Sequence, residues 1–159
     1  MEIRPIQADD NIEVAILIRS VLIEMGVSKK GTAYEDKELD TMYETYLGKR
    51  AVYYLVIDGD KILGGAGISV LKGSTVSICE LQKMYFSPAA RGKGLGFKMI
   101  QKCLDFAKSN QFSLCYIETT PIMESAQRLY KKVGFNYIDK PLGNTGHSSC
   151  SIWMTKPLA

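Results

Sequence analysis

The order of apolar and polar residues predicts that the chain begins with a short strand and two helices. The strand is expected at about residues 2–6, and the capping residues 9–11 start a helix that Gly26 ends. After the polar loop 27–34, an acidic start and helical spacing predict a second amphipathic helix over residues 35–47. Its apolar face contains Leu39, Met42, Tyr43, Tyr46 and Leu47.

The middle of the chain has the pattern of three strands. β-Branched and aromatic residues predict a strand at 52–57, and the turn sequence 58–60 leads into a second strand from Lys61, so the two form a hairpin. A third strand is expected from about residue 75 to residue 86. It should end before Pro88, because proline lacks the N–H group that a central strand donates.

The last part of the chain alternates helices with strands. One helix is predicted by a face that contains Gly96, Met99, Ile100, Cys103, Leu104 and Ala107. A strand at 112–119 precedes a helix that Thr120 and Pro121 open and Gly134 caps. The buried face of that helix would be Ile122, Ala126, Leu129, Tyr130 and Val133. Two closing strands are expected near 135–139 and 148–155.

These elements predict an α/β fold with a mixed, mostly antiparallel sheet of six to seven strands. Interleaved strands and helices favour helices on both faces of the sheet, while the tight hairpin requires antiparallel pairing. A chain of 159 residues with 46% hydrophobic composition can bury one core. We therefore expect a single domain over residues 1–159.

Composition narrows the classes of function. A net charge of +3 is too small to indicate a nucleic-acid partner. The four cysteines form no CxxC pair, so we expect no metal site and no disulfide framework, but reduced, buried side chains. The N-terminal sequence does not resemble a signal peptide, and no apolar run reaches the roughly 18 residues of a membrane span. A cytoplasmic protein without membrane contact is expected.

The strongest chemical signal is a glycine-rich segment between a strand and a helix. Gly92, Gly94 and Gly96 would remove obstructing side chains and permit positive φ, so that backbone N–H groups and the helix N-terminus converge on a phosphate. Between residues 91 and 108, five basic residues face one acidic residue, which favours an anionic ligand. The alternative is a loop followed by a solvated basic helix.

The residues alone leave open which phosphate ligand is bound. A Rossmann fingerprint would need a glycine where Phe97 stands, although Glu118 lies where an acid could bind a ribose hydroxyl. A nucleotide-cofactor enzyme of Rossmann type therefore stays an alternative. A P-loop is excluded, because its glycine-lysine-serine/threonine sequence is absent.

The segment resembles the acetyl-CoA signature of the GNAT superfamily of N-acetyltransferases, Gln/Arg-x-x-Gly-x-Gly/Ala. The resemblance extends to residues 80–88 and 126–135 and to the order of elements over nearly the whole chain. It implies acetyl-CoA as acyl donor, with its pantetheine arm along the fourth strand. The implied contact residues are Met84, Tyr85, Phe86, Arg91, Gly92, Lys93, Gly94, Leu95 and Gly96. Many members carry an asparagine where this chain has Met123, so one pantetheine contact is expected to be missing.

The resemblance also implies catalytic roles for the direct attack of a primary amine on the thioester. Glu80 matches the general base of some members, and Tyr130 matches the tyrosine that protonates the leaving thiolate. Backbone of Met84 would help to polarise the carbonyl. The alternatives are a salt-bridged Glu80 and a core Tyr130, as in a module that binds acyl-CoA without catalysis.

The acceptor has no recognisable sequence code. It is expected to be an amine of a small molecule or a peptide, and Tyr34 and His147 are weaker candidates for binding it. The loop that contains His147 borders the acceptor site in the family. Relatives often pair through their closing strands, so the resemblance also implies a possible homodimer.

Overall fold

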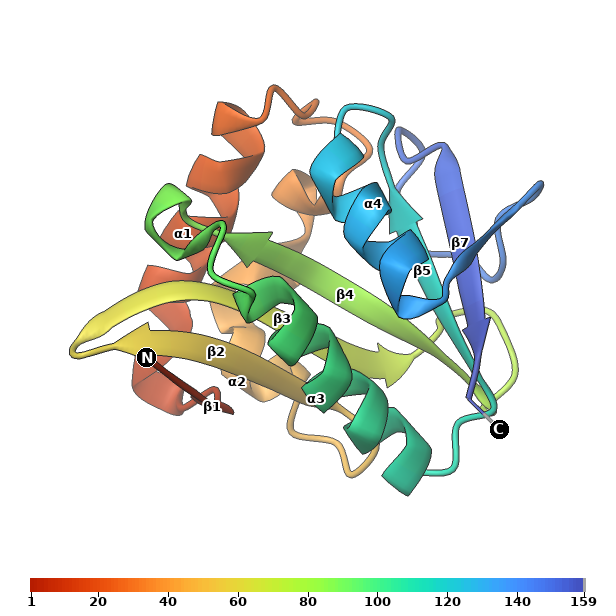
Figure 1. Ribbon diagram of the computed structural model, residues 1–159, viewed down its shortest axis with the longest axis horizontal. Coiled ribbons are helices and arrows are strands. Elements are labelled where there is room, and N and C mark those ends of the chain that lie inside the picture. The colour runs from red at the N-terminus through yellow and green to blue at the C-terminus, as the bar shows by residue number, and fades with distance from the viewer. Residues whose placement is uncertain (159) are drawn as a thin grey trace.

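The computed structural model describes residues 1–158 and contains one seven-stranded sheet (Figure 1). The strands are β1 (Glu2–Pro5), β2 (Val52–Asp58), β3 (Lys61–Val70), β4 (Ile78–Phe86), β5 (Leu114–Thr119), β6 (Asn136–Ile138) and β7 (Ile152–Pro157). Their spatial order is β1-β2-β3-β4-β5-β7-β6. Only β4 and β5 pair in parallel; the other neighbours are antiparallel. The predicted mixed, mostly antiparallel sheet is confirmed.

Helices cover both faces of this sheet, as the alternating elements predicted. Figure 1 shows α1 (Asn11–Glu24) and the short α2 (Met42–Thr45) behind the sheet, and α3 (Leu95–Ser109) and α4 (Glu124–Val133) in front. Each face has its own buried apolar cluster. Among residues 1–158, no helix is both long and apolar enough to cross a membrane.

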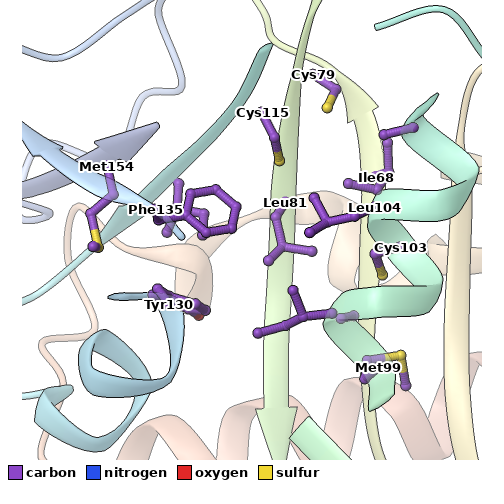
Figure 2. Packing of buried hydrophobic residues seen from close by; sticks show 14 of the residues in the cluster. Ile68, Cys79, Leu81, Met99, Cys103, Leu104, Cys115, Tyr130, Phe135 and Met154 are labelled. Carbon is purple, nitrogen blue, oxygen red and sulfur yellow. The ribbon is translucent and has the colours of Figure 1, made fainter. Parts of the chain in front are cut away.

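The α3 helix illustrates how the apolar pattern fixes packing. Met99, Ile100, Cys103, Leu104 and Ala107 are at most 1% exposed and lie against β2, β3 and β4. Figure 2 shows Met99, Cys103 and Leu104 pointing from α3 toward Ile68 and Leu81 of the sheet. Burying a side chain of this size contributes about 1.5–3 kcal/mol, which places α3 firmly on the sheet.

Two predicted helices differ from the structure. The expected helix at 35–47 consists of the 3₁₀ turns η2 (Ala33–Glu35) and η3 (Lys37–Thr41) followed by the one-turn α2. Asp36 has an extended backbone between η2 and η3, because its carboxylate contacts Lys83 and His147 from other parts of the chain. Tertiary contacts therefore override the helical spacing of the apolar residues.

The α4 helix begins later than predicted. It starts at Glu124, so Ile122 lies in the preceding turn and is 51% exposed rather than buried. Tyr130 is buried as predicted, and Ala126, Leu129 and Val133 pack partly buried against the same core. The cysteines follow the prediction except for Cys150, which is only half-buried.

A β-bulge interrupts the pairing of β3 with β4. Gly65 pairs with Tyr85 and Gly67 with Gln82, so β4 contains one extra residue between these pairs. The extra residue permits Lys83 to adopt φ of 50°, and both Gln82 and Lys83 line the same cavity. The bulge thereby changes which side chains of β4 face each side of the sheet.

Candidate active site

The glycine loop, residues 91–96, presents backbone donors at the start of α3. Gly92 and Gly94 have φ of 73° and 74°, and a Cβ atom at either position would meet nothing within 4 Å. Their role is therefore conformational, as predicted. Within residues 1–158, the N–H groups of residues 92–97 donate no hydrogen bond to the protein. The loop thus offers a group of free amides beside a helix N-terminus, which suits a phosphate.

Gly96 has a different role from the one predicted. It lies within α3, and its φ is not positive. A Cβ atom at this position would come within 2.8 Å of Leu129 Cδ2 on α4. Gly96 therefore permits the close packing of two helices and does not supply a left-handed turn.

Arg91 is held by the protein itself. Its Nη1 atom lies 2.6 Å from Glu24 Oε1, and its Nε atom donates to the carbonyl of Phe86 at 3.0 Å. These contacts fix the loop between α1 and the end of β4. Lys93 is exposed, and Leu95 is buried where α3 begins.

The parallel pairing of β4 and β5 is short. It ends at Glu80 and Tyr116, although β4 continues to Phe86 and β5 to Thr119. Figure 1 shows the two strands diverging beyond this point, with α4 in front of the opening between them. This part of β4 therefore has no strand partner on its β5 side. Met84 and Phe86 pack toward the α3 and α4 face, whereas Tyr85 packs toward α1.

Glu80 faces a cavity on the α1 side, which we call the polar cavity. Its lining residues include Asp36, Glu80, Lys83, Glu118, Thr120, Thr145, His147 and Cys150. Gln82 Nε2 donates to Glu80 Oε1 at 2.7 Å, and Tyr46 in turn donates to Gln82 Oε1 at 2.6 Å. Burial raises the pKa of Glu80, and the hydrogen bond from Gln82 opposes this only in part.

Tyr130 lies on the other face of the sheet and does not line the polar cavity. Its ring is 5% exposed and lies edge-on to Phe135, with 6.1 Å between the ring centroids (Figure 2). Burial raises the pKa of Tyr130, so its phenol keeps its proton. Within the described residues its hydroxyl makes no hydrogen bond. Glu80 and Tyr130 thus stand on opposite sides of the sheet, near the point where β4 and β5 part.

Residues 21–135 match the model of the acetyltransferase (GNAT) family. The chain belongs to the GNAT acetyltransferase family. It is therefore an N-acetyltransferase, and acetyl-CoA, the acyl donor of this family, is its donor substrate. The free amides of the glycine loop and the parting of β4 and β5 fit such a donor.

Individual relatives agree with this assignment. The chain is 41% identical over 156 residues to the uncharacterized N-acetyltransferase YjgM of Escherichia coli K12, which covers 98% of this chain and 93% of the relative. A Staphylococcus aureus acetyltransferase of the GNAT family has a TM-score of 0.86 at 21% identity and 99% coverage of both chains. A phosphinothricin acetyltransferase from Sinorhizobium meliloti, solved with acetyl-CoA, has a TM-score of 0.79 at 20% identity, over 99% of this chain and 88% of the other.

The family and the sheet together exclude the Rossmann alternative. A Rossmann sheet is mostly parallel, but this acetyltransferase has one parallel pair, β4 with β5. Glu118, near the end of β5, therefore does not mark the ribose site of a Rossmann fold. It lines the polar cavity instead.

The two weaker candidates for acceptor binding differ in position. His147 lines the polar cavity, and its Nε2 atom lies 2.9 Å from Asp36 Oδ2. Burial alone would lower the pKa of His147, but the hydrogen bond and charge of Asp36 outweigh it and raise that pKa. Tyr34 is not among the lining residues; Arg19 and Lys29 approach the faces of its ring.

Sequence reasoning missed the residues that shape the polar cavity. Lys83 Nζ, on a side chain only 4% exposed, lies 3.1 Å from Glu38 Oε1 and 3.6 Å from Asp36 Oδ2. The hydroxyl of buried Tyr53 donates to the carbonyl of Lys83 at 2.7 Å. The one available signal was Lys83 itself, a lysine within a largely apolar strand. A buried ammonium group requires acidic partners, so this lysine predicted carboxylates nearby.

Proposed function

We propose that this acetyltransferase acetylates a primary amine by direct attack, with Glu80 as general base and Tyr130 as hydrogen-bond donor to the departing thiolate. The supporting observation is the position of the two groups. Glu80 faces the polar cavity from one side of the sheet, and Tyr130 lies on the opposite side, beside the region where β4 and β5 lose their pairing. An acceptor in the cavity would approach the thioester from the side opposite Tyr130.

The donor would be held by main-chain groups. The N–H groups of residues 92–97 would bind the diphosphate, and the unpaired edge of β4 at Met84 and Phe86 would bind the pantetheine arm. Acetyl-CoA supplies an activated thioester carbonyl. Met123 lines the polar cavity and cannot replace the amide of the family asparagine, so that contact is expected to be missing.

Glu80 has the environment of a general base for an ammonium group. An alkyl ammonium has a pKa of about 10.4, so about three units separate it from neutral pH, at ~1.36 kcal/mol per unit. Burial raises the pKa of Glu80 toward that of the amine, which improves the match for proton transfer. Gln82 fixes one carboxylate oxygen, and the second makes no hydrogen bond within residues 1–158.

Tyr130 has the environment of a donor rather than a base. Its raised pKa keeps the proton on the phenol throughout the physiological range. A hydroxyl without a partner inside the described protein is free to donate to sulfur. Tyr130 on α4 shares a core cluster with Leu81 of β4, so it would face the thioester from the side opposite an acceptor in the polar cavity.

Two conservative substitutions test this proposal in an assay of free-thiol release from acetyl-CoA. Tyr130→Phe should lower kcat at least tenfold with little change in the KM for acetyl-CoA. Glu80→Gln should lower kcat/KM and flatten its acidic limb against pH. Tyr54→Phe, which changes a half-buried tyrosine on the same face as Tyr130, is the matched control. A protein that only binds acyl-CoA would release no thiol, and unchanged kcat in Tyr130→Phe would remove the donor assignment.

We propose that residues 1–159 form a single cytoplasmic domain, that the acceptor is a small molecule or peptide rather than nucleic acid or lipid, and that two copies pair through the closing strands. β6 is an edge strand of the sheet, which leaves one side available for such pairing. Sedimentation of the purified protein would test the last point.

A further inference from the structure

The polar cavity contains more carboxylates than cations. Its carboxylates are Asp36, Glu38, Glu80 and Glu118, and its cations are Lys72, Lys83 and, when protonated, His147. Every one of these cations is paired with Asp36 or Glu38, at distances from 2.9 to 3.6 Å. When His147 is protonated, these three cations exceed Asp36 and Glu38 by one charge, so the four carboxylates leave the cavity with one net negative charge.

Glu80 and Glu118 are different. Within residues 1–158 neither carboxylate has a salt bridge. Glu118 Oε2 is buried and has no hydrogen-bond partner in the described protein. Leaving a buried polar atom unpaired costs about 1–3 kcal/mol, and more for a charged group. Because neither of these two carboxylates has a cation of its own, the cavity favours added positive charge.

Three further polar groups near Glu118 also lack a hydrogen-bond partner: the hydroxyls of Thr120 and Tyr116, and Nε1 of Trp153, which pairs with Glu118 across β5 and β7. Thr120 is 9% exposed and lines the polar cavity, and its Oγ1 atom has no hydrogen-bond partner in residues 1–158. The hydroxyl of Tyr116, a residue that is fully buried, is likewise unpaired. Tyr116 and Glu118 are two residues apart in β5 and share a face of the strand, whereas Thr120 directly follows the strand and lines the polar cavity with Glu118. Because buried polar groups nearly always have partners, this group points to a polar ligand.

The register of the strands sets the spacing between the two free carboxylates. Glu80 pairs with Tyr116, and Glu118 is two residues farther along β5 on the same face. Two residues of a strand span about 6.6 Å and adjacent strands lie about 4.8 Å apart, so the diagonal from position 80 to position 118 is about 8 Å. An extended unbranched chain of about five or six carbons separates two amino groups by a similar distance.

We propose that Glu118, together with Thr120, is a specificity subsite for a second amino group of the acceptor. The acceptor class is then a linear α,ω-diamine with about five or six carbons between its nitrogens. One nitrogen reacts beside Glu80, and the other, as an ammonium group, binds Glu118 Oε2 and Thr120 Oγ1. The inference rests on the proposed function, because Glu80 marks the position of the reacting amine.

Steady-state kinetics with matched acceptors test this subsite. The probes are 1,5-diaminopentane, 1,6-diaminohexane and 1-aminopentane, which lacks the second amino group. In the wild-type enzyme, kcat/KM for either diamine should exceed that for the monoamine at least tenfold. In Glu118→Gln this ratio should fall at least tenfold, mainly through a higher KM for the diamine. Glu124→Gln, on the exposed first turn of α4, is the control and should keep the wild-type ratio.

Two results would overturn the inference: a wild-type enzyme without preference for the diamines, or a ratio that Glu118→Gln leaves intact. Thr120→Val provides a second variant if Glu118→Gln does not fold, and an unchanged ratio in it also overturns the subsite. Failure of the proposed function has a different signature. In that case Glu80→Gln would retain full kcat with every amine, whatever the ratio between diamine and monoamine.

Discussion

Tyr53 offers a sharp test of how the β4 bulge is held. Its hydroxyl donates to the carbonyl of Lys83 at 2.7 Å, and its ring lies across the glycines of β3, where a Cβ atom on Gly65 would come within 2.6 Å of it. Tyr53→Phe keeps the ring and removes the hydroxyl. The carbonyl of Lys83, at the residue with φ of 50°, then loses its buried partner.

The expected cost follows from this contact. Loss of one partner of a buried hydrogen bond costs about 1–3 kcal/mol of unfolding free energy. For a protein of this size, each kcal/mol lowers Tm by about 2–4 °C. A central value of about 2 kcal/mol therefore predicts a fall in Tm of about 4–8 °C. Because Met84 follows the bulge directly, the KM for acetyl-CoA should rise as well.

Thermal unfolding followed by circular dichroism measures the change in Tm. Tyr54→Phe is the matched control, since it removes the same atom from the next residue, where the hydroxyl makes no hydrogen bond within residues 1–158. Lys102 still lies over the remaining ring. If both variants have the same Tm as the wild type, the hydrogen bond from Tyr53 does not support the bulge and the reasoning is refuted.

Two further predictions concern the glycine loop and the histidine. Gly94→Ala should lower the free energy of unfolding by about 1–2 kcal/mol through its φ of 74° alone, and should weaken acetyl-CoA binding. Gly96→Ala should lower the free energy of unfolding by about 1–3 kcal/mol, because its Cβ atom would overpack against Leu129. Calorimetry with and without acetyl-CoA separates the two effects, and equal losses of acetyl-CoA affinity in both variants would contradict this division. His147 has a raised pKa in the folded state, so its contact with Asp36 adds stability that is complete below its ordinary pKa of 6.5 and is lost as pH rises through the folded value. The Tm difference between wild type and His147→Asn should therefore be largest below about pH 6 and shrink at alkaline pH, and a difference that grows with pH would count against the pairing.

Local pattern was sufficient to predict much of the fold and the conformation of the glycine loop. The 3.6-residue spacing of Met99 to Ala107 specifies a helix and its buried face, because that spacing is set by the backbone. The glycine loop could be predicted for a similar reason, because Gly92 and Gly94 act through their own φ angles and need no distant partner. Membership of the family was likewise encoded in these contiguous motifs.

The acceptor side was decided by tertiary structure. Asp36 interrupts a helically spaced segment because it binds Lys83 from β4 and His147 from the loop before β7, which are 47 and 111 residues away in the chain. Glu118 lies near Glu80 only because the parallel register of β4 with β5 sets Glu80 opposite Tyr116, two residues before Glu118. Such contacts join residues that are distant in sequence, so they arise from the packing of the whole chain. The sequence by itself therefore determined the strands, the helices α1 and α3 and the glycine loop, whereas only the fold determined which charges meet around the polar cavity.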